Sequence, residues 1–314
     1  MSRPKVSAVV PSYNHEEFLR RRLDSVFNQT FTDMEIILLD DASDDNCAEI
    51  MAEYADDPRV THFSVNKKNS GSPFIQWKKG TDIATGEYLW IAESDDWAEL
   101  TLLEELVPML DADPSLGYVY CDTQVHGYPE CKLTSEFNNR RFDTDRWSHD
   151  HRNNGVDEIR NYMGKGNTIL SGSGVLYRTD VVKRMNAIDT RFRYVGDMYT
   201  FFKIMNETDL AYLAKPLNCY QHHGRNLTPE GFANGRSGLE MIAAYGPILP
   251  SYTPEQQEEL IDSLAIGFRK ASHNLNLTTP AVWSLALSEL ISSSPILRKV
   301  LWRNFKYFFS GPKD

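Results

Sequence analysis

The chain lacks any apolar stretch close to the ~20 residues that a membrane-spanning helix requires, and its first ten residues lack the apolar segment of a signal peptide. It also has few cysteines, and they show neither CxxC pairing nor zinc-finger spacing. These four residues are Cys47, Cys121, Cys131 and Cys219. We therefore expect reduced thiols in a cytoplasmic protein.

Positive charge is also in short supply. Lys and Arg number 33 against 44 Asp and Glu, which gives a formal net charge of −11. A nucleic-acid-binding protein needs a basic face, so the balance argues against that class of partner. The same charge is unfavourable for an anionic ligand, unless a metal ion or another local group neutralises it. The length of 314 residues allows one large domain or two modest ones.

The first third of the chain alternates short apolar runs with amphipathic segments. Each run has the length of a strand, and each segment repeats its apolar residues at helical spacing. This alternation predicts a Rossmann-like, mostly parallel sheet flanked by helices. Ser43 is the expected N-cap of the second helix. The expected strands start at 5, 35, 60 and 87, and the expected helices cover 15–30, 43–54 and 72–86.

The remainder of the chain has a weaker pattern. A helix is expected near 99–111, a strand over 117–125, and a long polar loop over 126–155. Two further strands, at 172–178 and 210–220, flank a helix that begins near Asp197, and helix formers dominate from 254 onward. We predict one domain over 1–230, with a nucleotide-binding half (1–98) and an acceptor-binding half (99–230). A helical C-terminal extension, 231–314, follows it.

Polar residues follow three of the predicted strands. "PSYN" follows the first strand, "DDAS" the second and "ESDD" the fourth. Each is an ordinary turn sequence when taken alone. In an open α/β sheet, however, ligands bind beyond the carboxyl ends of the strands, where these three segments meet. Crowded carboxylates become tolerable around a divalent cation, and oxygen ligands suit Mg²⁺ or Mn²⁺. A nucleotide diphosphate would complete the shell of the ion.

These segments resemble those of the family 2 glycosyltransferases with the GT-A fold, which include enzymes of bacterial cell-surface and spore-coat polysaccharides. The stretches that carry the resemblance are "VVPSYNHEEFLRRRLDSVFNQTF", "EIILLDDASDD" and "GEYLWIAESDDW". The resemblance implies that Pro11 and Tyr13 bind the nucleotide and that Asp41 hydrogen-bonds the base edge. It also implies that Asp95 contacts the ribose and that Asp96 binds the metal.

Two features depart from the family pattern. Glu93 stands where the family often has the first Asp of its acidic motif. The usual Arg-Asn pair before the fourth strand is replaced by Trp77 and Lys78. Lys78 and Lys79 are interpreted as a solvated helix face rather than as phosphate ligands.

Inverting sugar transfer needs a general base for the acceptor hydroxyl. In the family, an acid that opens a helix after the acceptor-side strand has this role, and "VGDMY" places Asp197 there. An acid at a helix N-terminus is also common for purely structural reasons. His223 matches a late histidine of the family and is a candidate second metal ligand.

The sugar-binding residues are indicated more weakly. The small residues Ser171, Gly172 and Ser173 match the acceptor-facing segment of the family and would leave room for a sugar, although they equally suit an ordinary turn. Asp122, at the end of a predicted strand, is a candidate for the donor-sugar side.

The sequence thus predicts an inverting, metal-dependent glycosyltransferase with a UDP-linked donor and a glycan or lipid-linked acceptor. The alternatives are a nucleotidyltransferase of similar fold and an inactive nucleotide-binding module. The tail over 294–309 has one broad apolar face and one basic face. It is either an interfacial helix on the inner face of the cell membrane or a helix docked on its own domain or on a second subunit.

Overall fold

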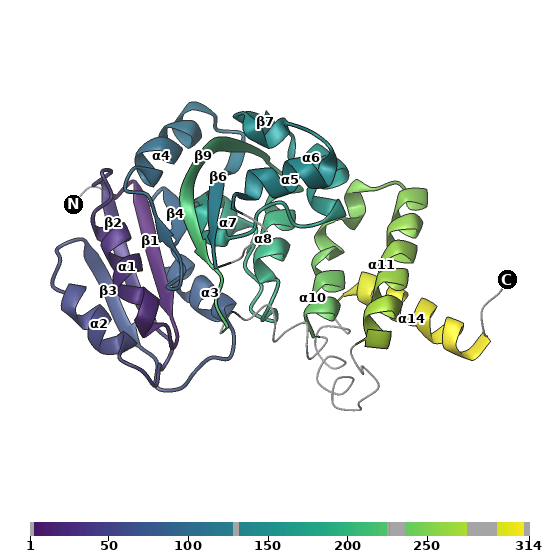
Figure 1. Ribbon diagram of the computed structural model, residues 1–314, viewed down its shortest axis with the longest axis horizontal. Helices are drawn as coiled ribbons and strands as arrows, with labels where there is room; N and C mark the ends of the chain where they lie inside the picture. The colour runs from purple at the N-terminus through teal and green to yellow at the C-terminus, as the bar shows by residue number, and fades with distance from the viewer. Residues whose placement is uncertain (1–2, 128–131, 225, 227–235, 275–293, 311–314) are drawn as a thin grey trace.

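The protein is described by a computed structural model that covers residues 3–127, 132–224, 226, 236–274 and 294–310. Within these residues the chain forms a nine-stranded sheet with helices on both faces (Figure 1). The strands are β1 (Val6–Ser12), β2 (Met34–Asp40), β3 (Val60–Val65), β4 (Tyr88–Ile91), β5 (Trp97–Ala98), β6 (Leu116–His126), β7 (His151–Asn153), β8 (Val175–Arg178) and β9 (Asp209–Gln221).

Helices and short 3₁₀ turns connect these strands. The α-helices are α1 (Glu16–Phe27), α2 (Cys47–Tyr54), α3 (Pro73–Ile83), α4 (Leu102–Ala112), α5 (Thr134–Phe142), α6 (Gly155–Asn161), α7 (Thr179–Arg184), α8 (Gly196–Met205), α10 (Arg236–Ala244), α11 (Pro254–Asn274) and α14 (Pro295–Ser310). The 3₁₀ turns are η1 (Arg146–Ser148), η2 (Met163–Lys165), η3 (Gly172–Gly174) and η4 (Gly246–Ser251). None of the helices in the described part of the chain is both long and apolar enough to cross a membrane.

The first four strands are parallel and run in the order β3-β2-β1-β4, which confirms the predicted unit. Successive side chains of a strand point to opposite faces. Val9 therefore belongs to one hydrophobic cluster while Val10 belongs to the other. Because β1 lies between β2 and β4, the chain segments after β1 and β4 diverge at this point of the sheet. Such switch points are where α/β sheets bind ligands.

The second half of the sheet is mixed. β8 lies antiparallel between β4 and β6, and β6 pairs in parallel with β9. The prediction of a long polar loop over 126–155 is wrong, because α5, η1 and β7 form within this range. α5 lacks a continuous apolar stripe, and its first turn is held instead by the Asp122 carboxylate. This carboxylate accepts hydrogen bonds from the Thr134 hydroxyl and from the backbone and hydroxyl of Ser135.

The predicted N-cap of α2 is also wrong. The N-cap residue is Asn46, without a side-chain capping bond. The Ser43 hydroxyl instead donates to Asp40 Oδ2 over 2.6 Å and accepts from the Asn14 backbone N–H. Ser43 therefore fastens the ends of β1 and β2 together at the edge of the sheet. The thiols of Cys47, Cys121 and Cys219 are free and buried, as expected, and Cys131 lies outside the described residues.

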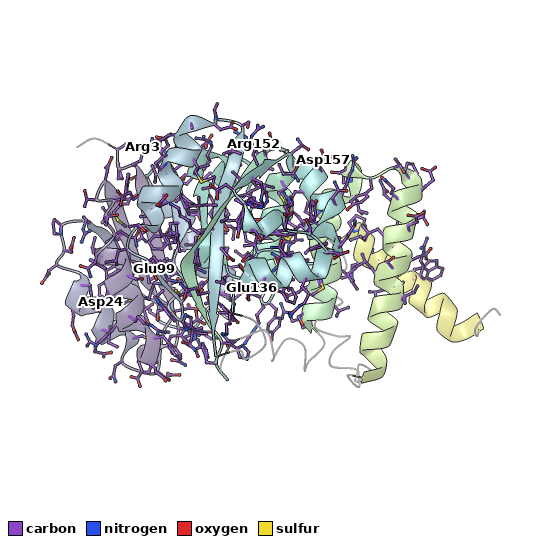
Figure 2. The ribbon with its side chains drawn as sticks, turned by 45° about the horizontal axis from the view of Figure 1, so that its top comes forward. Arg3, Asp24, Glu99, Glu136, Arg152 and Asp157 are labelled. Carbon is purple, nitrogen blue, oxygen red and sulfur yellow. The ribbon has the colours of Figure 1, made fainter. Side chains whose placement is uncertain are left out.

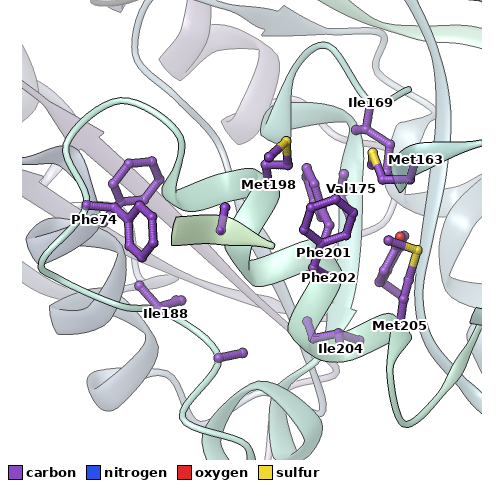
Figure 3. Close-up of a cluster of buried hydrophobic side chains, with 14 of the residues drawn as sticks. Phe74, Met163, Ile169, Val175, Ile188, Met198, Phe201, Phe202, Ile204 and Met205 are labelled. Carbon is purple, nitrogen blue, oxygen red and sulfur yellow. The ribbon is translucent and has the colours of Figure 1, made fainter. Parts of the chain in front are cut away.

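The C-terminal helices gather at the end of the molecule that is farther from the N-terminus (Figure 1). They are not separate from the rest of the core. Leu239 and Ile242 of α10 belong to the same buried cluster as Phe201 and Phe202 of α8. Figure 3 shows the α8 part of this cluster, in which Met198, Phe201 and Met205 lie near Val175 and Met163. Packing on α10 therefore contributes to the position of α8.

The tail helix packs against the protein over its described first half. Ile296, Leu297 and Val300 are fully buried in the same cluster, and α14 contacts α11 and α10. Arg303 of the predicted basic face forms ion pairs with Glu258 and Asp262 of α11. Residues 295–303 therefore follow the alternative of a helix docked on its own domain. The side chains beyond 303, which include part of the predicted apolar face, lie outside the described residues.

Candidate active site

Most charged side chains lie at the surface, as the labelled residues Arg3, Asp24, Glu99, Glu136, Arg152 and Asp157 illustrate in Figure 2. A few are buried, and two of these, Asp41 and Asp96, line a cavity of about 450 Å³ at the carboxyl ends of β1 and β4. Eight of the predicted site residues line this cavity. They are Pro11, Tyr13, Asp41, Asp95, Asp96, Ser171, Gly172 and Asp197.

The other three predicted residues do not line the cavity. Ser173 lies beneath it, where its hydroxyl accepts from the Glu93 backbone N–H. His223 lies beside it, in contact with Asp95. Asp122 is buried elsewhere and holds the start of α5, so the structure does not support its prediction as a donor-sugar residue.

The two aspartates that follow β4 have different surroundings. Asp95 Oδ2 lies 3.2 Å from His223 Nε2, and the ring of His223 stacks on Phe18. Burial opposes the ionisation of Asp95, but the hydrogen bond from His223 and the charge of His15 hold the pKa of Asp95 below its usual value. Asp96 turns inward and accepts from the Ser171 hydroxyl (2.7 Å) and the Gln221 N–H (3.1 Å). Burial and the charge of Asp95 raise the pKa of Asp96 to about 6.

A group of side chains that could hold a metal ion lies beside the cavity. His15, Asp95 and His223 each present one ligand atom, and these atoms lie within 4.8 Å of one another. Among the described residues, this is the group of acidic, His and Cys side chains that fits a metal ion. Asp96, which was predicted as the ligand, is outside this group, and its carboxylate accepts hydrogen bonds from Ser171 and Gln221 instead. The predicted partner His223 is within it.

Glu93 lines the cavity beside these aspartates, and Arg22 contacts its backbone. The Trp77 indole N–H donates to the Glu93 carboxylate. Burial and the charge of Asp95 raise the pKa of Glu93 to about 8. Arg22 is fully buried, and its Nε donates to the Glu93 carbonyl over 2.7 Å. Its guanidinium is therefore a fixed positive charge next to the carboxylates. Lys78 pairs with Asp82, and Lys79 with Ser64 and Asn66, so neither lysine reaches the cavity.

The Asp41 carboxylate, predicted to bind the base edge of the nucleotide, already accepts several hydrogen bonds from the protein. Its carboxylate accepts from the side chains of Asn66 and Gln76, both over 2.6 Å. It also accepts from the amide of Asn69 and from the N–H and hydroxyl of Ser70. Gln76 belongs to α3, and the other donors belong to the segment between β3 and α3, part of which lines the cavity. Tyr13 also lines the cavity and is 40% exposed.

Asp197 lies in the first turn of α8, where the helix dipole favours its charge. Burial acts in the opposite direction and is the larger effect, and the charge of Glu240 adds to it. The pKa of Asp197 is therefore raised to about 6, although the Met198 N–H donates to its carboxylate over 2.8 Å. Within the described residues, this is the one hydrogen bond that Asp197 accepts from another residue.

The raised pKa predicts that Asp197 costs stability at neutral pH. A carboxyl group whose pKa is higher in the folded state destabilises the protein once the pH rises through the folded value, here about 6. We expect Asp197→Asn to be more stable than the parent by about 1–3 kcal/mol at pH 8, and the difference to vanish near pH 4. Thermal unfolding at both pH values measures it. A destabilised variant at pH 8 would contradict this expectation.

Comparison with known proteins shows the family of the chain. The model of glycosyl transferase family 2 matches residues 7–185, more than half of the chain, so the chain belongs to this family. It is thus a transferase rather than a nucleotide-binding protein of another class.

The relatives differ in how much of them the chain covers. The chain is 30% identical over 143 residues to a GalNAc(5)-diNAcBac-PP-undecaprenol beta-1,3-glucosyltransferase of Campylobacter jejuni, which is 45% of each protein. For two longer relatives the matched stretch is only 17–18% of their length.

Solved structures show the same GT-A fold over nearly the whole chain. Staphylococcus aureus TarS (residues 1–349) in complex with UDP-GlcNAc matches with a TM-score of 0.66 and 16% identity, over 99% of this chain and 93% of that one. A mannosyltransferase of Pyrobaculum calidifontis with GDP-Man and Mn²⁺ matches with a TM-score of 0.57 and 14% identity, over 99% and 89% of the two chains.

Sequence reasoning missed four residues at this site, and the first of them is His15 of the group that fits a metal ion. Arg22 carried a signal, because it lies three residues after Leu19 and four before Val26, on the apolar stripe of α1. Gln76 gave none, since its pairing with Asp41 depends on how α3 packs. Glu240 was placed in a helical extension with no assigned role, although its charge acts on Asp197.

Proposed function

We propose that the protein is an inverting, metal-dependent glycosyltransferase. It would move a sugar from a UDP-sugar to a hydroxyl of a glycan or lipid-linked acceptor in cell-surface polysaccharide synthesis. One observation carries the proposal. Two features meet at one cavity: a group of side chains able to bind a metal ion, and a carboxylate that accepts few hydrogen bonds. The first is His15, Asp95 and His223, and the second is Asp197.

The metal group fits a divalent ion of intermediate softness. It offers one carboxylate and two imidazoles, and imidazole donors favour Mn²⁺ over Mg²⁺. When bound, the ion would neutralise the diphosphate of the donor and of the leaving UDP. The mannosyltransferase relative with Mn²⁺ supports this choice.

Asp197 would act as the base. Its carboxylate accepts the proton of the acceptor hydroxyl while the acceptor oxygen bonds to the anomeric carbon. The bond from that carbon to the diphosphate oxygen breaks, and UDP leaves with the electron pair. A single displacement inverts the anomeric centre. The other cavity carboxylates are less available, because Asp41, Asp96 and Glu93 already accept side-chain hydrogen bonds.

The nucleotide would lie between Tyr13 and Asp41. The ring of Tyr13 offers a stacking surface for the base. A base N–H that binds Asp41 would replace one of the donors that the carboxylate now accepts, such as Asn69 at 3.1 Å. The TarS complex with UDP-GlcNAc and the undecaprenol-linked substrate in the name of the Campylobacter relative support a UDP donor and a lipid-linked acceptor. Such an acceptor would place the enzyme at the inner face of the membrane.

Thermal shifts with nucleotide diphosphates test the donor and the metal together. A ligand that binds only the folded state at 100 times its Kd adds about 2.7 kcal/mol of stability. We expect UDP with Mn²⁺ to raise the melting temperature clearly more than GDP with Mn²⁺, and EDTA to remove most of the UDP effect. A larger shift with GDP would exclude the UDP preference. An equal UDP shift in EDTA would exclude a metal-assisted site.

A further inference from the structure

A buried glutamate outside the family-matched region contacts the chain that leads into α8. Glu240, on α10, is 0% exposed. Its carboxylate accepts the backbone N–H groups of Arg193 (2.9 and 3.0 Å), Tyr194 (2.7 Å) and Val195 (3.3 Å). Arg236 Nε, one helical turn earlier on α10, donates to it as well over 2.7 Å.

Three consecutive peptide N–H groups that converge on one carboxylate fix the backbone that carries them. Val195 is the N-cap of α8, and backbone N–H groups at a helix start have no carbonyl partner within the helix. Glu240 supplies that partner from another helix, with a charge that the helix dipole favours. Hydrogen bonds to a carboxylate are roughly twice as strong as those between neutral groups.

The fixed segment forms part of the cavity wall. Arg193 and Tyr194 line the cavity, and Asp197 follows Val195 by two residues. We propose that Glu240 is a positioning residue, which acts through the 193–195 backbone to hold Asp197 and the acceptor-side wall in place for transfer. This inference rests on the proposed role of Asp197. It makes α10 a functional part of the enzyme.

Glu240→Gln is the informative substitution. The amide retains the size of the side chain but has one acceptor oxygen, and its NH₂ group would face the N–H donors of the segment. The segment would then lose part of its anchor, while the β1 and β4 ends, where we place the nucleotide and the metal, have no contact with Glu240 among the described residues. A displacement of about 1 Å at a catalytic group can cost about 10²-fold in rate.

The test compares turnover with nucleotide binding on the full chain. The probe is release of UDP from UDP-GlcNAc with Mn²⁺, alongside the Kd of UDP. We expect Glu240→Gln to lower kcat about 10- to 100-fold with the Kd of UDP within twofold of the parent. Glu240→Asp, which keeps the charge, should lose less. The matched control is Glu258→Gln, which removes a carboxylate paired to Arg303 on the same C-terminal helices and should leave kcat unchanged.

Hydrogen–deuterium exchange gives a readout that does not depend on turnover. In Glu240→Gln, faster exchange should be confined to the peptide around 193–198. The proposal would be overturned if the variant kept the parent's exchange rate at 193–198 or the parent's kcat. It would also be overturned if the Kd of UDP rose by the same factor as kcat fell. If Asp197→Asn keeps full turnover, the proposed base is wrong, whereas the exchange result still tests the anchor. Loss in Asp197→Asn without loss in Glu240→Gln would reject the anchor alone.

Discussion

Asp197→Asn is expected to lower turnover about 10²–10⁴-fold, the usual contribution of a general base. Asparagine keeps the shape of the side chain and can still accept the Met198 N–H, but it cannot take the proton of the acceptor hydroxyl. Because Asp197 is not part of the metal group, the Kd of UDP with Mn²⁺ should not change. Steady-state kinetics and UDP titration on the same preparation measure both quantities.

The pH profile of the parent is a second readout of the same residue. A base must be deprotonated to act, and the pKa of Asp197 is raised to about 6 by burial and by the charge of Glu240. We expect kcat/KM to fall as the pH drops below about 6, and this acid limb to be absent from the residual activity of Asp197→Asn. Full turnover by the variant would transfer the base role to another carboxylate. If the parent itself shows no turnover, the result would favour the alternative of an inactive nucleotide-binding module.

The second large effect is expected for the metal group. Asp95→Ala removes its one carboxylate and leaves His15 and His223 without an anionic ligand. The Mn²⁺-dependent part of the UDP thermal shift should disappear. If the ion supplies several kcal/mol to the displacement, turnover should fall at least about 10²–10³-fold.

Asp96→Ala separates the two possible ligand assignments. Asp96 is bonded to Ser171 and Gln221, so its removal should weaken UDP binding less than the removal of Asp95, and some Mn²⁺ dependence should remain. Asp44→Ala is the matched control, because Asp44 is exposed and does not line the cavity. If Mn²⁺ dependence is lost with Asp96→Ala and kept with Asp95→Ala, the ligand expected from the sequence is the right one.

The sequence was most informative where local pattern determines structure. The strand and helix periods of the first 98 residues predicted β1 to β4, and the polar residues after those strands predicted part of the cavity wall, including Asp41, Asp95 and Asp96. The orientation of a side chain within a short irregular segment has no such pattern. Asp96 turns inward because Ser171 and Gln221, which lie far from it in the sequence, donate to it. No spacing rule could predict that Asp95, and not Asp96, would lie with His15 and His223.

The sequence also carried no signal for packing between helices that lie far apart along the chain. Glu240 reads as a polar residue on an amphipathic helix, and only the docking of α10 on α8 brings it to the backbone of 193–195. α5 was missed for a related reason, since it is held by Asp122 at its start rather than by an apolar stripe. Arg22 is the exception, because a charge on the apolar stripe of α1 is visible in the sequence.

The contact between Asp95 and His223 has a consequence for the order of folding. These residues are 128 positions apart, and the contact between Asp96 and Gln221 spans 125. Closing loops of this length has an entropic cost that must be met before the contacts stabilise anything. During synthesis, β1 to β4 can pair long before β9 leaves the ribosome. We therefore expect the four-stranded parallel sheet to be able to form before Asp95 and Asp96 meet His223 and Gln221.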